Sequence, residues 1–170
     1  AQGLNESFVL TVEALYEYLS KLRPGGYLAM TRRLKLPPRD GLKIFATAIA
    51  ALARQGVNEP ARRLALIRGW STVTLLVRKG GLSQNDTKAI RAFAAARSFD
   101  LAYLPGLKPE EVNTNNILRR AYYYEAATAL LSPARHDFIS RYKYDIRPAT
   151  DDRPYFSDFF RWRTLPEILT

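Results

Sequence analysis

The residues best suited to chemistry lie in one short segment near the C-terminal end of the sequence. Asp151 and Asp152 are adjacent carboxylates, Arg153 follows them directly, and Tyr155 lies two positions further on. Two neighbouring carboxylates in a loop could hold a polyamine cation or a metal ion, and Arg153 could pair with either of them. The structural alternative is that Thr150 and Asp151 close a turn while Arg153 forms a salt bridge. Both interpretations stay open on the sequence.

Three other groups of side chains could bind ligands, although each also has an ordinary structural explanation. Consecutive tyrosines could stack on a base or substrate, yet such a run more often wraps one helix around a core. A lone histidine between charged neighbours is expected at the surface. Basic residues after a strand could bind an anion, or they could simply be solvated. These groups are Tyr122, Tyr123 and Tyr124; His136; and Arg32, Arg33, Lys35 and Arg39.

The C-terminal tail combines aromatic rings with arginines. Rings beside cationic side chains suit a membrane interface, and they equally suit a tail that packs back on its own domain. The sequence does not choose between the two. The residues concerned are Phe156, Phe159, Phe160 and Trp162, with Arg161 and Arg163.

The composition excludes several classes of protein. The 170 residues include no cysteine and one histidine, so disulfide frameworks, thiolate metal sites and zinc sites built on histidine clusters are excluded. Hydrophobic residues make up 47% of the chain, which excludes an intrinsically disordered protein. The apolar stretches fall short of the roughly 20 residues that a membrane-spanning helix needs.

The net charge is +10, from 26 basic and 16 acidic residues. Such a charge would suit nucleic acid, another polyanion or an anionic membrane surface. The basic residues nevertheless occur as scattered pairs rather than as a continuous run, as at Arg32–Arg33, Arg62–Arg63, Arg78–Lys79 and Arg119–Arg120. We therefore expect most of them to form a solvated surface, and we do not expect nucleic acid as the partner.

The first elements predicted are a helix and a strand. Apolar residues recur at helical spacing over residues 5–22, with Asn5 or Ser7 as the cap, and Pro24-Gly25-Gly26 ends this helix. The mostly apolar run 27–31 is typical of a strand that is buried on both faces. The chain begins Ala1-Gln2-Gly3, without an initiator methionine or a signal-peptide pattern, and we expect it to be a piece of a longer protein.

A second helix is predicted with Asp40 as its N-cap and Gly56 at its end, and a hairpin follows it. Only Gly69-Trp70-Ser71 separates strands 63–68 and 72–78, and so short a link requires antiparallel pairing. Further along, we expect a helix that starts at a Ser83 cap and ends near residue 98, a short strand over 99–104, a polar loop over 107–116 and helices over 117–131 and 134–142. The predicted division is an α/β unit over 1–104 and a helical extension with an aromatic tail over 105–170.

The order helix, strand, helix, hairpin resembles the second half of a class I S-adenosylmethionine-dependent methyltransferase domain. In that fold the fifth strand is parallel to its neighbour, and the seventh strand is inserted antiparallel beside the sixth. The local sequence is similar to the family's "L-x-P-G-G-x-L" turn, where Pro ends a helix and two glycines permit a sharp reversal. It reads Leu22-Arg23-Pro24-Gly25-Gly26-Tyr27-Leu28.

A second stretch narrows the resemblance. Residues 145–156 are similar to the "P-x-T-D-D-R-P-F/Y-F" signature of spermidine-synthase-like proteins that are fused to membrane helices. With Ser7–Glu13 and the ending Trp162–Pro166, the resemblance covers nearly the whole chain. It implies an aminopropyl or methyl transferase, a cytoplasmic domain at the membrane, and flanking membrane helices as partners. The fold class expected is therefore α/β, a partial Rossmann-like methyltransferase fold followed by a helical C-terminal segment.

The sequence departs from that family where the cofactor should bind. The fold needs a glycine-rich turn after its first strand and an acidic residue that holds the ribose, but no G-x-G occurs here. We therefore expect no cofactor on this fragment and no activity from it alone. S-adenosylmethionine or its decarboxylated form is the cofactor expected for the full-length protein.

Other functions remain open on the sequence. The chain could be a basic α/β module that binds nucleic acid or an anionic membrane surface, or a non-catalytic structural domain of a membrane protein. Without the upstream half of the domain, strand 27–31 would have an open edge. That edge could be covered by a second copy in a homodimer, which we favour, or by strand 100–104 of the same chain.

Overall fold

Four strands form one sheet in the order β1-β3-β2-β4, and each neighbouring pair is antiparallel. The computed structural model describes residues 6–161. The strands are β1 (Tyr27–Arg33), β2 (Leu64–Arg68), β3 (Thr72–Arg78) and β4 (Asp100–Tyr103). The predicted hairpin is confirmed, because β2 and β3 pair directly across Gly69-Trp70-Ser71. Since β3 is antiparallel to both of its neighbours, β1 and β2 run in the same direction.

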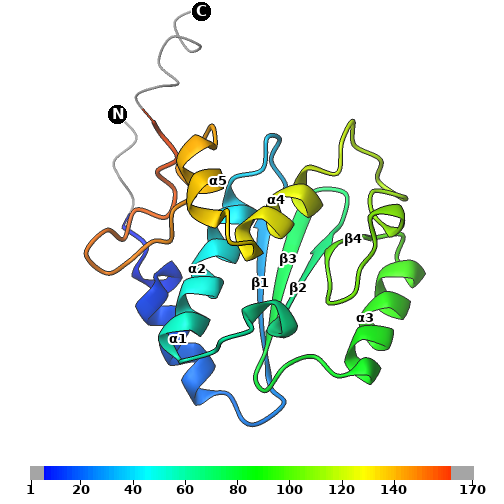
Figure 1. Cartoon of the computed structure of the whole chain (residues 1–170), viewed down its shortest axis with the longest axis horizontal. Helices are drawn as coiled ribbons and strands as arrows, with labels where there is room; N and C mark the ends of the chain where they lie inside the picture. The colour runs from blue at the N-terminus through cyan, green and yellow to red at the C-terminus, as the bar shows by residue number, and fades with distance from the viewer. Residues whose placement is uncertain (1–5, 162–170) are drawn as a thin grey trace, which may run out of the picture.

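Helices cover the two faces of this sheet, which gives the predicted mixed α/β class (Figure 1). One side carries α1 (Val12–Lys21), α2 (Asp40–Arg54) and α4 (Tyr122–Leu131), and the other side carries α3 (Gln84–Ala96). The helix α5 (Arg135–Arg141) follows α4. Short 3-10 helices occupy Phe8–Leu10, Pro60–Arg63 and Pro109–Glu111. In the described part of the chain, no helix is both long and apolar enough to cross a bilayer.

The helix α2 is the centre of the main core. Its side chains are buried almost all round, as at Leu42, Phe45 and Ile49, because the sheet, α1 and α4 all pack against it. Gly41 allows the closest approach: a Cβ at this position would lie 2.5 Å from a methyl carbon of Val73. The prediction that Asp40 caps this helix was wrong: Asp40 is its first residue, and the cap residue is Arg39, whose side chain makes no capping hydrogen bond.

Two helix starts show where local sequence signals were sufficient and where they were not. Ser83 caps α3 as predicted, in a capping box with Asp86. The first helix was expected from residue 5, but α1 begins after Thr11, whose hydroxyl accepts a hydrogen bond from the amide of Ala14. Ser7 precedes a separate 3-10 turn without a side-chain cap, and Asn5 lies outside the described residues.

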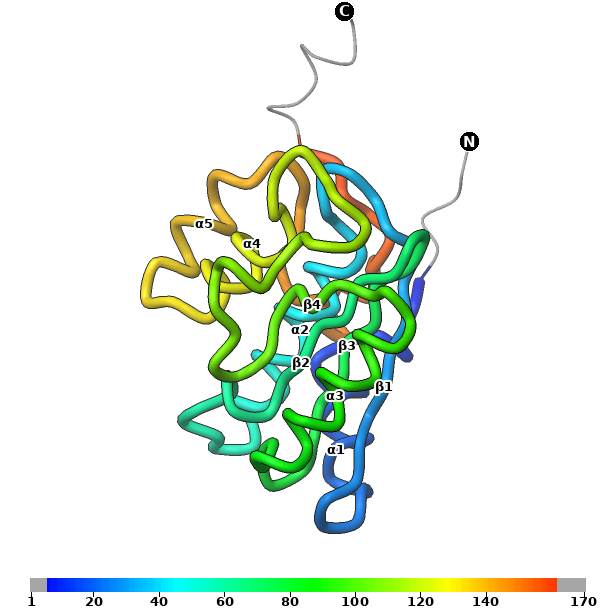
Figure 2. Tube along the Cα trace, turned by 90° about the vertical axis from the view of Figure 1, so that its right-hand side faces the viewer, coloured from blue at the N-terminus to red at the C-terminus, as the bar shows by residue number. Residues whose placement is uncertain are grey.

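The strand β1 lies at an edge of the sheet, so the expectation that it is buried on both faces was wrong (Figure 2). Its residues alternate between exposed and half-buried along all seven positions. Leu28 and Met30 pack toward α2, whereas the opposite face of β1 is open. The reason is that α3 packs over β2 and β4, where Ala65 and Ile67 meet Ile90 and Ala94 in a second, smaller core.

The outer edge of β1 has backbone groups that point away from the sheet. The carbonyl of Gly26 accepts a hydrogen bond from the Lys79 amide (2.9 Å), and the Leu34 amide donates to the carbonyl of Ser71 (2.8 Å). Both residues are even-numbered, and in an antiparallel pair the residues that bond to the neighbouring strand alternate along the chain. Even-numbered residues of β1 therefore bond to β3, and odd-numbered residues direct their amides and carbonyls outward. The predicted strand near residues 100–104 exists, but it pairs with β2 at the opposite edge and does not cover β1.

The C-terminal part is helical over α4 and α5 and irregular over 142–161. The helix predicted from residue 117 begins only at Tyr122. The irregular segment returns to the N-terminal part of the chain, where the amides of Ser7 and Val12 donate to the carbonyls of Pro154 and Ala149. Side chains from α4 and from this segment, including Tyr123 and Phe156, belong to the same core as α2.

Candidate functional site

The segment with the paired carboxylates forms a tight turn against the start of α1. The amide of Arg153 donates to the carbonyl of Thr150 (2.9 Å), which closes the turn. The Thr11 hydroxyl donates to Asp151 Oδ1 at 2.6 Å, and the Asp151 amide donates to Glu13 Oε2 at 3.1 Å. The turn itself agrees with the structural interpretation, whereas the contact by which Asp151 holds the cap residue of α1 in place was not predicted.

The other predicted site residues of this turn do not converge on a common point. Asp152 and Arg153 are exposed, and neither side chain makes an ion pair within residues 6–161, so the predicted Arg153 salt bridge is absent there. The Tyr155 hydroxyl lies 3.5 Å from Glu6 Oε1. No cluster of three or more metal-ligating side chains occurs in the described part of the chain.

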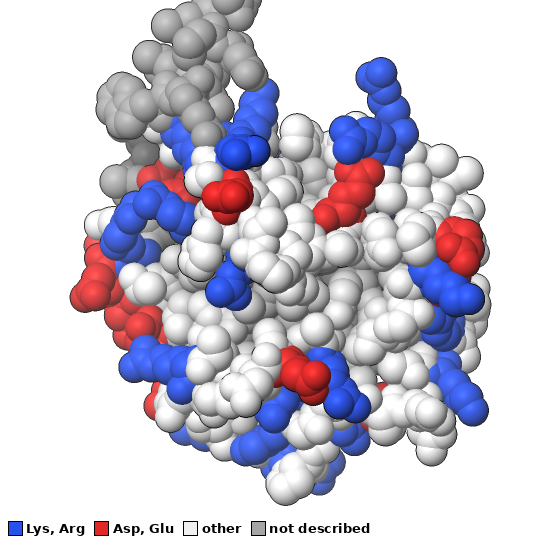
Figure 3. All heavy atoms as spheres, viewed as in Figure 1, with Lys and Arg blue, Asp and Glu red and all other residues white. Residues whose placement is uncertain are grey.

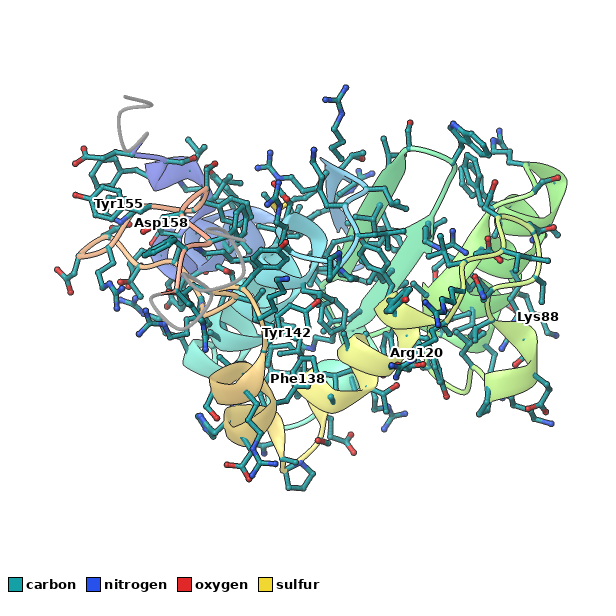
Figure 4. All side chains as sticks on the ribbon, turned by 90° about the horizontal axis from the view of Figure 1, so that it is seen from above. Lys88, Arg120, Phe138, Tyr142, Tyr155 and Asp158 are labelled. Carbon is teal, nitrogen blue, oxygen red and sulfur yellow. The ribbon has the colours of Figure 1, made fainter. Side chains whose placement is uncertain are left out.

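Lys43 is the most unusual charged residue of this region. It comes from the buried face of α2, its exposed fraction is 4%, and its Nζ donates to the carbonyls of Tyr155 (3.1 Å) and Asp158 (2.8 Å). Figure 4 labels the two carbonyl residues side by side on the tail segment. The Nζ also lies 5.0 Å from the ring centre of Phe159 and 5.7 Å from that of Phe156. The tail thus closes over an otherwise isolated cation.

Burial lowers the pKa of Lys43 from 10.5 to about 8. The removal of water from the ammonium group is the main cause. The negative charges of Asp145 and Asp158 act in the opposite direction, and the positive charges of Arg147 and Arg153 add to the effect of burial. Lys43 is therefore a cation whose charge the fold only partly compensates.

Asp145 and Arg147 form a close ion pair beside Lys43. The Arg147 guanidinium donates to both carboxylate oxygens of Asp145, with distances from 2.5 to 3.1 Å, and Arg161 lies 3.8 Å away. Burial acts to raise the pKa of Asp145, but the hydrogen bonds from Arg147 outweigh it and hold this pKa below its ordinary value. The Asp145 carboxylate is thus ionised, and both of its oxygens already accept hydrogen bonds from Arg147.

A small cavity lies among these charged groups. Its volume is about 40 Å³, and its lining includes Lys43, Asp145, Arg147, Arg153 and Tyr155. A cavity of this size can hold a water molecule or a small ion, but not a polyamine or a nucleotide. The geometry therefore supports a structural cluster here rather than a substrate pocket formed by residues 6–161 alone.

Tertiary structure brings together two groups that the sequence presented separately. The Arg39 guanidinium lies 5.4 Å from the ring centres of Tyr144 and Phe159, and that of Arg32 lies 5.1 Å from Phe156. Two of the four basic residues that the sequence left open between anion binding and solvation are therefore covered by aromatic rings of the tail. This arrangement matches the interpretation in which the tail packs on its own domain. Trp162 and Arg163 lie outside the described residues.

The tyrosine run and the histidine have simple environments. Tyr123 is 2% exposed and its hydroxyl donates to the Lys35 carbonyl at 3.1 Å, so it belongs to the core. Tyr122 and Tyr124 are half-buried on either side of it. His136 is exposed, as predicted.

On the face seen in Figure 3, the basic side chains are dispersed among acidic and uncharged ones.

Sequence reasoning missed Lys43 and gave no role to Asp145 and Arg147. Lys43 interrupts the apolar run Gly41-Leu42-Lys43-Ile44-Phe45, and a cation at a core position is a usable signal of a buried partner.

Comparison with protein-family models, with curated proteins and with solved structures found no match to this chain.

Proposed function

We propose that this chain is the C-terminal half of a spermidine-synthase-like domain with the S-adenosylmethionine-dependent methyltransferase fold. In this proposal its role is to complete the sheet of a transferase whose cofactor site lies in the upstream half. The strand order supports it, because β3 lies antiparallel between β1 and β2, which run in the same direction. That is the arrangement expected of the last three strands of this fold.

The observation that carries the proposal is the open side of β1. Tyr27, Ala29, Thr31 and Arg33 direct their backbone amides and carbonyls outward, over a seven-residue strand without proline or bulge. An edge of this kind readily accepts another strand. In the proposed parent domain, a parallel strand from the upstream half pairs here.

The sheet face next to this edge supports the same partner. A groove of about 520 Å³ lies beside β1 and β3, with Tyr27, Leu76, Phe93 and Phe99 in its walls. Tyr27 and Phe93 are 41% and 44% exposed, which is much apolar surface to leave in water. An upstream unit that contributes one strand and one helix would cover the edge and the face together.

The remaining parts of the proposal rest on the resemblance alone. These are the transfer of an aminopropyl or methyl group, the use of S-adenosylmethionine or its decarboxylated form, the flanking membrane helices and the position at the cytoplasmic face. In this view Lys43, its neighbours Asp145 and Arg147, and the Asp151 turn fix the C-terminal tail on the domain. They contribute rigidity to the parent enzyme, and they supply no cofactor contact.

Hydrogen exchange at single residues tests the proposal. In the isolated chain, the amides of Ala29, Thr31 and Arg33 should exchange fast and those of Leu28 and Met30 slowly, since only the latter bond to β3. In the longer parent protein, all five should be protected. Protection of the odd-numbered amides in an isolated chain that is a dimer by light scattering would point to a second copy instead, and fast exchange in the parent would contradict the proposal.

A calorimetric titration checks the cofactor half of the proposal separately. The isolated chain should give no binding heat with S-adenosylmethionine or its decarboxylated form, whereas the parent protein should bind one of them. Micromolar binding to the isolated chain would contradict the assignment of the cofactor site to the upstream half.

A further inference from the structure

A groove lies between α2 and α5, lined by side chains from both helices and from the tail segment. Its volume is about 880 Å³, within the range of about 300–1,000 Å³ that small-molecule sites occupy. Most of its surface is apolar, and a few charged side chains stand at its walls. Its lining includes Ala46, Ala50 and Ala53 from α2, Ile139 and Arg135 from α5, and Phe160 from the tail.

The floor of the groove is one face of α2. Ala46, Ala50 and Ala53 follow one another at helical spacing, and their small side chains leave a channel along the helix. Ala46 is buried, Ala50 is half-buried and Ala53 is exposed, so the channel deepens toward the N-terminal part of α2. Ile139 and Phe160 form apolar walls. A linear alkyl chain can lie along such an apolar floor.

The charged groups in the walls favour an anion. Arg135, Arg147 and Arg161 line the groove with a single carboxylate, that of Asp145, to balance them. Arg147 and Arg161 both lie against Asp145, whereas the Arg135 guanidinium has no hydrogen bond or ion pair within residues 6–161. One free guanidinium matches one carboxylate, because a guanidinium can donate two parallel hydrogen bonds to it.

We infer that this groove binds a long-chain carboxylate, with the alkyl chain along the alanine floor of α2 and the carboxylate on Arg135. The exposed imidazole of His136, the next residue on α5, can donate a further hydrogen bond to the same head group. This site is independent of the proposed function, since it lies away from β1 and its edge. It adds a ligand that nothing in the transferase proposal requires.

Fluorescence titration of the full chain with dansyl-labelled undecanoic acid tests the inference, below the concentration at which the probe forms micelles. We expect saturable binding of the acid at one site. The uncharged methyl ester should bind at least about tenfold more weakly than the acid. Arg135→Ala should weaken binding of the acid about tenfold, the loss expected for one charge-assisted interaction. Arg141→Ala is the matched control, because Arg141 lies on the same helix outside the groove, and it should leave binding unchanged.

A second variant fills the channel. Ala50→Trp should abolish binding while the melting temperature stays near that of Ala92→Trp, a control at an exposed position of α3. Equal binding of the acid and the ester, or full binding by Arg135→Ala or Ala50→Trp, would overturn the inference. Binding to phosphatidylglycerol vesicles without binding to the monomeric acid would also overturn it, because the ligand would then be a membrane surface.

Discussion

Lys43 offers the sharpest test of how the tail and the central helix stabilise each other. The residue is 4% exposed, and its ammonium group has carbonyl oxygens and aromatic rings as its partners. Replacing it with methionine removes the charge and keeps a flexible side chain of similar length. The perturbation therefore separates the effect of the charge from the effect of filling the space beneath the tail.

The size of the effect follows from the two pKa values of Lys43. In the unfolded chain the ammonium group titrates near 10.5, and in the folded protein near 8. Below pH 8 both states are protonated, and the folded state carries the full cost of a buried charge, roughly 3 kcal/mol for a difference of about 2.5 pH units. As pH rises from 8 to 10.5, the folded state loses its proton first, so that stability increases.

The measurement is the free energy of unfolding from urea titrations at pH 7 and pH 10. The difference between the natural chain and Lys43→Met should shift by about 2–3 kcal/mol in favour of the natural chain over this interval. Lys88→Met, at an exposed position of α3, is the matched control and should show no such shift. Burial raises the pKa values of Tyr123 and Tyr142, so at higher pH these tyrosines oppose the trend, which sets the upper limit of the window.

Equal pH dependence in the natural chain and in Lys43→Met would refute the reasoning. It would mean that the ammonium group keeps its water in solution, and hence that the tail does not close over α2 as the carbonyl contacts of Tyr155 and Asp158 require.

Two further predictions concern single carboxylates. Asp151→Ala should lower the free energy of unfolding by about 1–2 kcal/mol, because the cap residue Thr11 loses its partner, whereas the exposed neighbour Asp152→Ala should change it by less than about 0.5 kcal/mol in the same urea titration. Asp100 accepts hydrogen bonds from three backbone amides and from buried Arg68, so Asp100→Ala should cost about 3–5 kcal/mol. Burial raises the pKa of Asp100 but the backbone hydrogen bonds and Arg68 outweigh it, so its contribution is present at neutral pH and lost on acidification, and Asp100→Asn should flatten the acid side of the stability curve in circular dichroism.

The turn and cap signals of the sequence were reliable where they acted within a few residues. Three residues between two apolar runs required the β2–β3 hairpin, and Ser83 with Asp86 placed the start of α3. The same kind of reasoning failed for the first helix, because the hydroxyl of Thr11 is held by Asp151, 140 positions away. Thr11 is itself a usual cap residue and accepts from the amide of Ala14, but Asn5 and Ser7 are equally good candidates, and the local sequence does not choose among them.

The candidate site was only partly predictable for a related reason. The sequence singled out the Asp151 turn, the basic residues from Arg32 to Arg39 and the aromatic tail. The structure packs the tail on Arg32 and Arg39, and it places the turn against the start of α1. The sequence could not identify Lys43, since a lysine in an amphipathic helix is ordinarily solvated at its tip. Only the return of the tail over α2 removes that water.

Local signals were sufficient to predict the α-helices and strands in their order and the antiparallel hairpin, because hydrophobic periodicity, glycine and proline turns and helix caps act over short distances along the chain. The tertiary structure alone decided which surfaces are buried. An apolar run such as Tyr27–Met30 satisfies a central strand and an edge strand equally well, and its exposure depends on where α3 packs. The partners of Lys43 lie 112 and 115 positions away, and no local pattern encodes contacts at that separation.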